Sequence, residues 1–538
     1  RCQTKNRSGK SEGVGFGYDQ NEIGIIVGLQ TMGPFKIKNT LPNNIISLVI
    51  MRHILKTISG SLLILFITAQ ALAQTETEKL NVVFILADDL GWSDLSGYGS
   101  DLHETPNLDR LAKQGMKFTN AYAAAPICTP SRASIMTGKF PARLHMTTWH
   151  ENSGTPTPNN KDKLVAPATV GNLPLDETTI AEVFQEAGYF TAHVGKWHLG
   201  DAAHYPQTHG FEVNIGGTMW GAPDTYWSPY RGQKFQNEYR YIPDLGSAST
   251  DEKNKAPAYL TDALTDKAVQ IIKENSNTPF FLNLWYHTVH TPIEGKPQLV
   301  EYYEKKVKPG MKDQNYEYAA MVASLDENVG RVLQAIDNVG IADNTIVIFF
   351  SDNGGRIGKY KDWETVANNS PLRSGKGSLY EGGIREPLII KWPGITKAGS
   401  VCDSPVISND FFPTLMEIPA LKKTQIERDQ HDGISLMHVL KDPKLPLERE
   451  ALFWHSPHYY TTTSPVSAIR KGPWKLIHYF EDDHLELYDL DRDLDEKNNL
   501  ADTYPEKAKK IYEELKTWRK DIDAQFPSYN PLYVPGNW

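Results

Sequence analysis

Continuous apolar runs that end abruptly in polar residues constrain this chain more than any other feature. The run 81–87 reads NVVFILA, and the runs at 280–286 and 345–350 have the same character. This composition is typical of strands in a parallel sheet, where helices cover both faces. Helical patterns separate the runs, at 105–115, 179–188, 258–274 and 316–339. Because strands alternate with helices, the sequence predicts a three-layer α/β domain.

The pattern changes after about residue 440. Short apolar runs separated by tight turns indicate an antiparallel meander, and they lie at 452–454, 467–470, 474–477 and 485–490. A helix is expected from Pro505, a favourable residue in a first helical turn. Its apolar stripe would consist of Ile511, Leu515, Trp518 and Ile522. We therefore predict a large α/β domain over residues 74–440 and a smaller C-terminal subdomain over residues 441–538, an antiparallel sheet with one helix.

Residues 51–73 have the three parts of a secretory signal peptide. A short basic start begins at Met51, an apolar run covers 61–67, and Ala71-Leu72-Ala73 has the small-x-small pattern of a cleavage site. The apolar run is too short for a membrane anchor, which is the alternative interpretation. We therefore expect an exported protein, periplasmic or secreted, with no membrane span in the mature chain. We interpret residues 1–50 as an upstream extension that is not native to the protein.

The charge and the cysteine content narrow the function classes. The full chain has a net charge of −9, and residues 1–73 carry 8 Lys and Arg against 3 Asp and Glu, so the mature chain is more acidic still. An acidic exported protein is a poor partner for nucleic acid, and a polyanionic substrate would need a local basic pocket. A disulfide between Cys128 and Cys402 is one alternative, although it would be a sparse framework for so long a chain.

Two of the predicted buried strands end in paired oxygen ligands, Asp88-Asp89 and Asp352-Asn353. In open α/β sheets the functional site lies beyond the carboxyl ends of the strands. Three carboxylates that meet there would repel one another without a cation, and hard oxygen donors favour Ca²⁺ or Mg²⁺ over zinc. A turn or a helix cap would explain one Asp-Asp pair alone. The second pair makes a metal site the better interpretation.

Cys128 precedes a predicted helix, where free backbone N–H groups favour an anion. Arg132 adds a cation on the same side. A thiolate is a soft ligand that does not suit a hard-oxygen site, and a lone cysteine is often an inert core residue. However, residues 128–132, Cys-Thr-Pro-Ser-Arg, fit the pattern Cys-x-Pro-x-Arg. This sequence resembles the formylglycine modification signal of type I sulfatases.

The resemblance to type I sulfatases covers the whole mature chain. Further motifs occur in the family order, at 87–91, 195–200, 289–292, 351–354 and 375–383. The resemblance implies the alkaline-phosphatase-like fold, a large mixed and mostly parallel sheet sandwiched by helices. It also implies conversion of Cys128 to 3-oxoalanine (formylglycine) by a formylglycine-generating or sulfatase-maturating enzyme. The hydrated aldehyde would offer two hydroxyl oxygens, which removes the mismatch between a thiol and a calcium site.

The resemblance assigns a role to each motif residue. Calcium would be bound by Asp88, Asp89, Asp352, Asn353 and the modified Cys128. Arg132 and Lys196 would hold the diol, and His198 would take a proton from its second hydroxyl. Lys376 and His290 would grip the sulfate, and His290 would protonate the departing oxygen. One hydroxyl would attack sulfur, and deprotonation of the other would then expel sulfate.

Some alternatives stay open at the level of single residues. Surface solvation would also explain Lys196 and Lys376, and structural hydrogen bonds would explain the two histidines. His287 is either a second functional group or a packing residue. Ser374 stands where many relatives have a glycine, so the local loop path is expected to differ.

The leaving alcohol is expected to be a sugar hydroxyl. Aromatic faces stack on sugar rings, while Arg and His pair with sulfate or uronate; the candidates are Trp149, His150, Trp220, Trp227, Tyr230, Arg231, His455 and His458. Fragments of ulvan, carrageenan or glycosaminoglycan all fit. One alternative is a phosphatase or phosphodiesterase of the same superfamily, which would use Ser or Thr with two zinc ions. The other is an inactive sugar-binding protein on the same fold.

Overall fold

A mixed, mostly parallel sheet forms the centre of the molecule. The computed structural model describes residues 79–235, 238–245, 257–424 and 431–536, so the predictions for residues 1–50 and 51–73 lie outside it. Within this part nine strands follow the order β11-β2-β10-β9-β1-β8-β4-β5, with β12 beside β2. They are β1 (Asn81–Ala87), β2 (Met116–Tyr122), β4 (Phe190–Gly195), β5 (Val213–Ile215), β8 (Phe280–Trp285), β9 (Thr345–Ser351), β10 (Arg385–Lys391), β11 (Ser400–Cys402) and β12 (Val406–Ile407).

The middle of the sheet is parallel and completely buried. Strand β1 pairs in parallel with β8 and β9, and β8 pairs in parallel with β4. Every residue of β1, β8 and β9 is buried, which explains why these strands read as unbroken apolar runs. Strand β10 runs antiparallel to both β9 and β2. The predicted mixed and mostly parallel sheet is confirmed.

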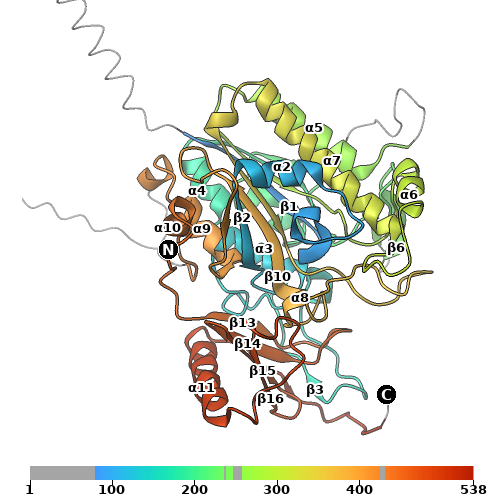
Figure 1. The fold of residues 1–538 in the computed structure, drawn as a ribbon, viewed down its shortest axis with the longest axis vertical. Coiled ribbons are helices and arrows are strands. Elements are labelled where there is room, and N and C mark those ends of the chain that lie inside the picture. The colour runs from blue at the N-terminus through green and yellow to red at the C-terminus, as the bar shows by residue number, and fades with distance from the viewer. Residues whose placement is uncertain (1–78, 236–237, 246–256, 425–430, 537–538) are drawn as a thin grey trace, which may run out of the picture. The chain divides into compact units, whose positions relative to one another are not determined.

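Helices cover both faces of this sheet. Alternate residues of β1 enter two separate cores, Val83 and Ile85 on one side and Phe84 and Leu86 on the other. The first core contains residues of α2 (Pro106–Gln114), α5 (Leu260–Glu274) and α7 (Tyr316–Asn338), which lie together in Figure 1. The second contains residues of α3 (Cys128–Thr137), α4 (Ile180–Glu186), α9 (Phe411–Leu415) and α10 (Met437–Lys441). The predicted sandwich follows from this division of side chains.

A four-stranded antiparallel sheet forms the C-terminal part, as predicted. Its order is β13 (Leu452–Ser456), β14 (Val466–Lys471), β15 (Trp474–Tyr479) and β16 (Leu485–Asp489). The helix α11 (Pro505–Asp521) lies beside it in Figure 1. Ile511 and Leu515 of α11 share a core with Leu476 of β15. The domain boundary at residue 440 stays a prediction.

Several short strands cannot be predicted from apolar runs in the sequence. Strand β5 pairs with β4 and extends the main sheet, and β6 (Arg231–Phe235) pairs with β7 (Glu238–Tyr241). Strand β3 (Leu164–Val165) pairs with β17 (Ser528–Tyr529). Strands of two to five residues carry too few positions for a detectable period. Helix α6 (Pro297–Glu304) packs on α7, and α8 (Glu381–Ile384) precedes β10. Of the helices in the described residues, none is both long and apolar enough to span a membrane.

Candidate active site

Four adjacent parallel strands end at the same edge of the main sheet, and each delivers polar side chains there. Asp352 and Asn353 follow β9, and Asp88 and Asp89 follow β1. His290 lies in the loop after β8, and Lys196 and His198 follow β4. Carboxyl ends of neighbouring parallel strands lie side by side, so residues far apart in the sequence converge. The pairings Asp352 N to Ala87 O (3.1 Å) and Asp88 N to Thr288 O (3.0 Å) fix these ends against one another.

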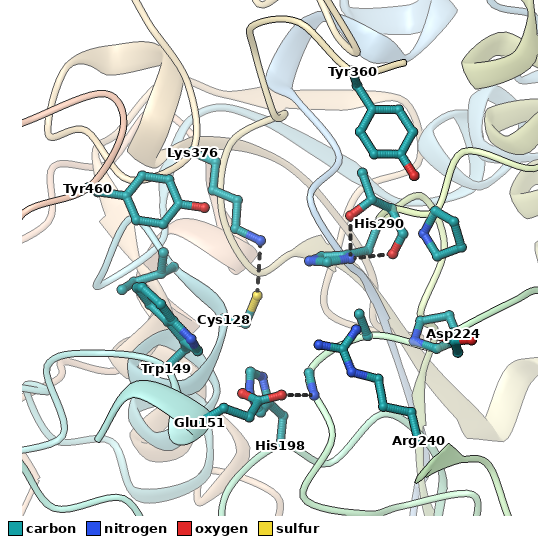
Figure 2. A pocket seen from close by; sticks show the side chains of 16 residues that line it. Cys128, Trp149, Glu151, His198, Asp224, Arg240, His290, Tyr360, Lys376 and Tyr460 are labelled. Atoms are coloured by element: carbon teal, nitrogen blue, oxygen red, sulfur yellow. Dashed lines mark hydrogen bonds and ion pairs between the residues drawn. The ribbon is translucent and has the colours of Figure 1, made fainter. Parts of the chain in front are cut away.

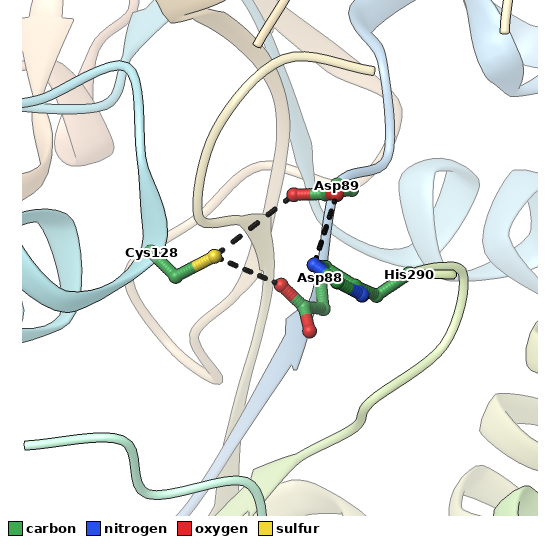
Figure 3. A group of neighbouring side chains, drawn as sticks. All are labelled: Asp88, Asp89, Cys128 and His290. Carbon is green, nitrogen blue, oxygen red and sulfur yellow. Dashed lines mark hydrogen bonds and ion pairs between the residues drawn. The ribbon is translucent and has the colours of Figure 1, made fainter. Parts of the chain in front are cut away.

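Cys128 is the first residue of α3, and the helix therefore starts at the cysteine rather than after it. Pro130 fits because a proline in the first turn lacks only an N–H that would be unpaired anyway. The Cys128 Sγ atom lies 3.4 Å from Asp88 Oδ1 and 4.0 Å from Asp89 Oδ1 (Figure 3). It lies 3.5 Å from Lys376 Nζ (Figure 2). Burial raises the pKa of the Cys128 thiol above its usual range, and Lys196 and Lys376 only partly offset this. An unmodified thiol would stay protonated here. It would be a weak nucleophile and a weak ligand.

Each carboxylate of the site has a cationic partner. Lys196 Nζ lies 2.7 Å from Asp88 Oδ2, and Lys376 Nζ donates to Asp89 Oδ2 at 2.8 Å. Burial opposes the charge on Asp89, yet Lys376 and then His290 hold the pKa of Asp89 below its usual range. Burial also works against the charges of Lys196 and Lys376, but the aspartates raise the pKa of both amines. The site is thus built from buried, paired charges.

Arg132 joins two of the strand ends. Its Nε and Nη2 atoms lie 2.8 Å from Asp352 Oδ2, and Nη1 donates to Lys196 O at 2.8 Å. The guanidinium also lies over the Trp285 ring at 5.2 Å. Arg132 is fully buried in helix α3, one turn after Cys128. It therefore holds the start of α3 against the ends of β9 and β4.

The oxygen atoms of the aspartates and the asparagine fit a hard cation. One ligand atom each from Asp88, Asp89, Cys128 and His290 lies within 4.8 Å of the others. Asp352 Oδ1 accepts from Asp89 N at 3.2 Å, and Asn353 Nδ2 donates to Asp89 Oδ1 at 2.8 Å. Asn353 Oδ1 is buried without a hydrogen-bond partner among the described residues. Burial, and then the Asp88 carboxylate, raise the pKa of Asp352 to about 6. A divalent cation on these oxygens would pair with Asn353 Oδ1 and would reduce the repulsion between the Asp88 and Asp352 carboxylates.

His198 forms a pair with Glu151, a residue that the sequence did not single out. His198 Nε2 lies 2.6 Å from Glu151 Oε2, and Gly221 N donates to Glu151 Oε1 at 2.9 Å. Burial lowers the pKa of His198 to about 4, although Glu151 opposes the shift. The backbone of His198 has φ 60°, an uncommon conformation for a residue with a side chain. A Cβ atom on Gly221 would lie 2.3 Å from His198 Cε1, so only glycine allows this approach.

His290 and the Glu151–His198 pair lie on different sides of Cys128 (Figure 2). Its Nε2 atom is 3.5 Å from Asp89 Oδ2, and Nδ1 is 2.7 Å from Thr291 O. Burial, then Lys376, lower the pKa of His290 to about 3. Because a carbonyl oxygen only accepts, Nδ1 carries the proton in the neutral ring and Nε2 has none. Nε2 is therefore the atom on which a proton would be gained or lost.

These groups border a cavity of about 420 Å³, which we call the main cavity. Cys128, His198, His290 and Lys376 line it directly, while the other predicted site residues lie beneath. Its remaining walls include residues that the sequence analysis missed: Glu151, Asp224, Arg240, Tyr360 and Tyr460. No periodicity or spacing marks them, since they come from loops and very short elements that are far apart in the chain. Of these residues, only Glu151 could have been found from the sequence, because it follows the candidate residues Trp149 and His150.

Most of the predicted sugar-contacting residues lie elsewhere. Among those eight candidates Trp149 alone is in the wall of the main cavity, with its ring 5.8 Å from that of Tyr460. His455 is bonded to Ser467 Oγ and Gln525 O at 2.6 and 2.7 Å, and His458 to Thr147 Oγ1 at 2.8 Å. His287 is buried, and neither of its ring nitrogens has a hydrogen-bond partner among the described residues. It lies outside the cavity wall. Cys128 and Cys402 are both free, so the alternative disulfide is absent.

The fold and the site define a class of protein. A mostly parallel sheet between helices carries a buried acidic cluster, with two lysines and an arginine, beside a cavity that is lined by a buried cysteine. Such an arrangement attracts a tetrahedral anion and stabilises charge on its oxygens. This is a hydrolase of the alkaline-phosphatase-like fold.

Comparison with known proteins identifies the family. The sulfatase family model matches residues 80–418, and the model for the C-terminal part of N-sulphoglucosamine sulphohydrolase matches residues 375–525. The chain belongs to the sulfatase family, and it is a sulfuric ester hydrolase.

Individual relatives agree with this assignment. A sulfatase of Formosa agariphila is 33% identical over 500 residues, which cover 82% of this chain and 89% of that protein. The human N-acetylgalactosamine-6-sulfatase is 32% identical over 418 residues, 73% of this chain and 74% of that protein. Among solved structures, the one titled Ps i-CgsB superposes with a TM-score of 0.66 at 31% identity, covering 84% and 94% of the two chains.

Proposed function

We propose that this sulfatase removes sulfate ester groups from sulfated carbohydrates, through a formylglycine derived from Cys128 and a calcium ion. The observation that carries the proposal is the main cavity, where a lysine and two histidines surround residue 128 and the rings of Trp149 and Tyr460 form one wall. Cations at the bottom suit the sulfate, and aromatic faces suit a sugar ring. The names of two relatives support a saccharide substrate, since one acts on N-acetylgalactosamine 6-sulfate and one was solved with a neocarrahexaose.

Cys128 is the residue that we propose to be modified. Its thiol is buried among carboxylates that raise the cost of a thiolate, so the unmodified side chain does not suit the chemistry. A hydrated aldehyde at this position would supply hydroxyl oxygens, one as a nucleophile and one as a hard ligand in place of the soft thiol. Conversion would require a formylglycine-generating or sulfatase-maturating enzyme as a partner. The predicted export to the periplasm or the medium belongs to the same proposal.

Calcium would be held by Asp88, Asp89, Asp352, Asn353 and residue 128. When bound, it would neutralise negative charge on the sulfate oxygens. The chain itself supplies cations for the same purpose. Lys376 Nζ lies 3.5 Å from Cys128 Sγ at the cavity wall, and Lys196 lies beneath it beside Asp88. We propose that Lys376 binds the sulfate, while Lys196 and Arg132 orient residue 128.

The two histidines are proposed to move protons in opposite directions. His198 donates its Nε2–H to Glu151, so Nδ1 of the neutral ring is free to accept a proton. The low pKa of His198 keeps this ring neutral at physiological pH. His290 would act as an acid from Nε2, next to Asp89. A bound sulfate anion favours protonation of His290, because it offsets the positive charge of Lys376.

The proposal is tested by product analysis on a panel of defined sulfated oligosaccharides, read by released sulfate and product mass. Mass spectrometry of the peptide that contains residue 128 tests the modification. An intact thiol in fully active protein would contradict the formylglycine. Turnover of phosphate esters in preference to sulfate esters would favour the phosphatase alternative, and binding of saccharides without turnover would favour the inactive sugar-binding protein.

The metal proposal has a readout of its own. Elemental analysis of the purified protein is expected to give one calcium per chain, and Asp352→Asn is expected to lose it. A protein that stays fully folded and metal-free, yet hydrolyses sulfate esters at the same rate, would sink this part of the proposal.

A further inference from the structure

A second cavity adjoins the main cavity. It has a volume of about 360 Å³ and shares three wall residues with the main cavity: Trp149, Lys376 and Tyr460. Figure 2 shows Trp149 and Tyr460 on the side of Cys128 that faces away from Asp224 and Arg240. We call this space the side cavity. When the sulfate of one sugar unit reaches Cys128, the next sugar unit of the same saccharide would lie in the side cavity.

The side cavity differs from the main cavity in charge. Its described lining contains two cations, Arg356 and Lys376, with hydroxyl groups from Tyr459, Thr461 and Thr462, and it contains no Asp or Glu. The lining of the main cavity contains the carboxylates of Glu151 and Asp224. A space with two cations and no carboxylate in its described lining favours an anion.

Arg356 is the group that makes the side cavity selective. Lys376 is already paired with Asp89, but Arg356 has no carboxylate within 4.0 Å among the described residues. Its guanidinium lies over the Tyr360 ring at 5.2 Å, and Nη1 is 3.4 Å from Thr291 Oγ1. Arg356 is half-buried and follows the Asp352-Asn353 pair by three residues. Its position is therefore fixed by the end of β9 and by the loop that carries His290, and its planar donors are available for a bidentate anion.

We propose that the side cavity binds a second anionic group, a sulfate or a carboxylate, on the sugar next to the one that is desulfated, and that Arg356 recognises it. The proposal rests on the proposed function, since it extends the same saccharide beyond the sulfate ester. The substrate is then a saccharide with at least two negative charges on adjacent sugars. Tyr460 and Trp149 separate the two anion sites and would contact the sugar rings between them.

The test compares binding of matched saccharides to protein in which Cys128→Ala prevents turnover. Isothermal calorimetry is run with a monosulfated disaccharide, with its counterpart that carries a second sulfate on the neighbouring sugar, and with a counterpart that carries a uronate carboxylate there. We expect at least one doubly charged saccharide to bind about tenfold more tightly than the singly charged one, as for one charge-assisted interaction. The two doubly charged arms distinguish a sulfate from a carboxylate.

Substitution then assigns the preference to Arg356. Arg356→Gln is expected to remove the tenfold preference, and Arg356→Lys is expected to keep part of it. Partial retention in Arg356→Lys would show that the loss in Arg356→Gln comes from the missing guanidinium donors and not from misfolding. Lys359→Gln is the matched control, because Lys359 is an exposed cation in the same loop that pairs with Glu364 at 3.7 Å. It should leave the preference unchanged.

Two results would overturn the inference. One is equal affinity for singly and doubly charged saccharides, and the other is an unchanged preference in folded Arg356→Gln protein. Neither depends on turnover. Failure of the proposed function is recorded separately, as absence of sulfate release from any saccharide by the metal-loaded protein with an intact Cys128.

Discussion

Two regions in the described part of this molecule bury clusters of opposite charges, and one of them belongs to the proposed catalytic site. The first, the catalytic cluster, consists of Asp88, Asp89, Asp352, Arg132, Lys196 and Lys376. The second, which we call the inter-sheet cluster, consists of Tyr122, Glu381, Arg385, Arg470, Lys475 and Glu496. In the inter-sheet cluster Lys475 Nζ lies 2.8 Å from both Glu381 Oε1 and Glu496 Oε1. Tyr122 donates to Glu381 Oε2 at 2.7 Å and contacts Arg470.

The inter-sheet cluster joins the two sheets. Tyr122 and Arg385 belong to β2 and β10 of the main sheet, while Arg470 and Lys475 belong to β14 and β15 of the C-terminal sheet. Glu381 and Lys475 are completely buried. The pKa of Glu496 is nevertheless raised to about 7, by burial above all. Perturbed charges are thus found in a structural network as well as in a catalytic one.

The residues that share a cavity with each cluster distinguish the two clusters. In the catalytic cluster Lys376 reaches the main cavity, next to Cys128 and His290. In the inter-sheet cluster Glu381 and Lys475 are completely buried, and the cavity that Glu496 borders has no histidine or cysteine in its described lining. Burial, ion pairing and an unmatched oxygen atom therefore do not identify a site by themselves, since Asn353 Oδ1 and Glu496 Oε1 both lack a hydrogen-bond partner among the described residues. The cysteine and the two histidines around the main cavity distinguish the catalytic cluster.

The largest expected effect is on activity, in the catalytic cluster. Cys128→Ala should lower turnover of sulfate esters by at least about a thousandfold, because it removes the residue that we propose to become the nucleophile. The melting temperature should change little, since alanine fits the first turn of α3. Steady-state kinetics and calorimetry measure the two quantities. Retained turnover would contradict the assignment of Cys128.

The next effect is on stability, in the inter-sheet cluster. Lys475→Met should lower the free energy of unfolding by about 3–5 kcal/mol, because Glu381 and Glu496 lose their shared buried cation. Denaturant unfolding measures the change, and kcat of the folded fraction should be retained. Lys471→Met is the matched control, because Lys471 forms a partly exposed pair with Glu514 and should cost less than about 1 kcal/mol. An equal loss of unfolding free energy in Lys475→Met and Lys471→Met would contradict the structural role of the inter-sheet cluster.

A smaller effect is expected at the Glu151–His198 pair. Glu151→Gln should lower kcat by about tenfold to a hundredfold with little change in KM, since His198 and Gly221 N occupy the two carboxylate oxygens and Glu151 would act through His198. Loss of this negative charge should also lower the pKa of His198 further, which moves any acidic limb of kcat that reports His198 to lower pH. A pH profile with separate kcat and KM values checks both. A rise in KM alone would instead make Glu151 a substrate-binding residue.

The smallest effect concerns pH and Glu496. Because the pKa of folded Glu496, about 7, lies above the usual 4.5, the folded protein binds this proton more tightly than the unfolded chain. The resulting stabilisation is fully present below pH 4.5 and is lost as pH rises through 7. Glu496→Gln should flatten this dependence by on the order of 1 kcal/mol. Unfolding in denaturant at pH 5, 6, 7 and 8 tests it, and an unaltered slope would contradict the raised pKa.

Much of the fold was predictable because it is encoded in local patterns. Strands β1, β8 and β9 are buried on both faces, so their sequences are apolar throughout, and α5 and α7 show a helical period over many residues. The antiparallel direction of β10 and the edge strand β5 carry no such signal. Direction in a sheet depends on how the connecting chain returns, and β5 is held by pairing with β4 alone.

The site divides in the same way. Residues in short motifs, such as Cys128, Pro130 and Arg132, could be named from spacing, because a helix turn brings them together. Glu151, Arg356 and Tyr460 could not, because each comes from a loop whose path is set by distant contacts. Trp220, His455 and His458 were named for their chemistry, yet they lie outside the cavity walls. Residue type alone does not determine which way a loop side chain faces.

The sequence by itself determined the family, the identity of the buried strands and the polar residues at their ends. These features follow from local sequence. A strand that is buried on both faces, and the motif at the start of α3, can each be recognised within about ten residues. The tertiary structure decided which of two buried charge clusters lies beside Cys128 and the two histidines, which carboxylate pairs with His198 and which arginine borders the side cavity. Those features depend on distances between segments hundreds of residues apart, as between Cys128 and Lys376. Cys128 is recognisable from its neighbours in the chain, but its surroundings are decided by the ends of four strands.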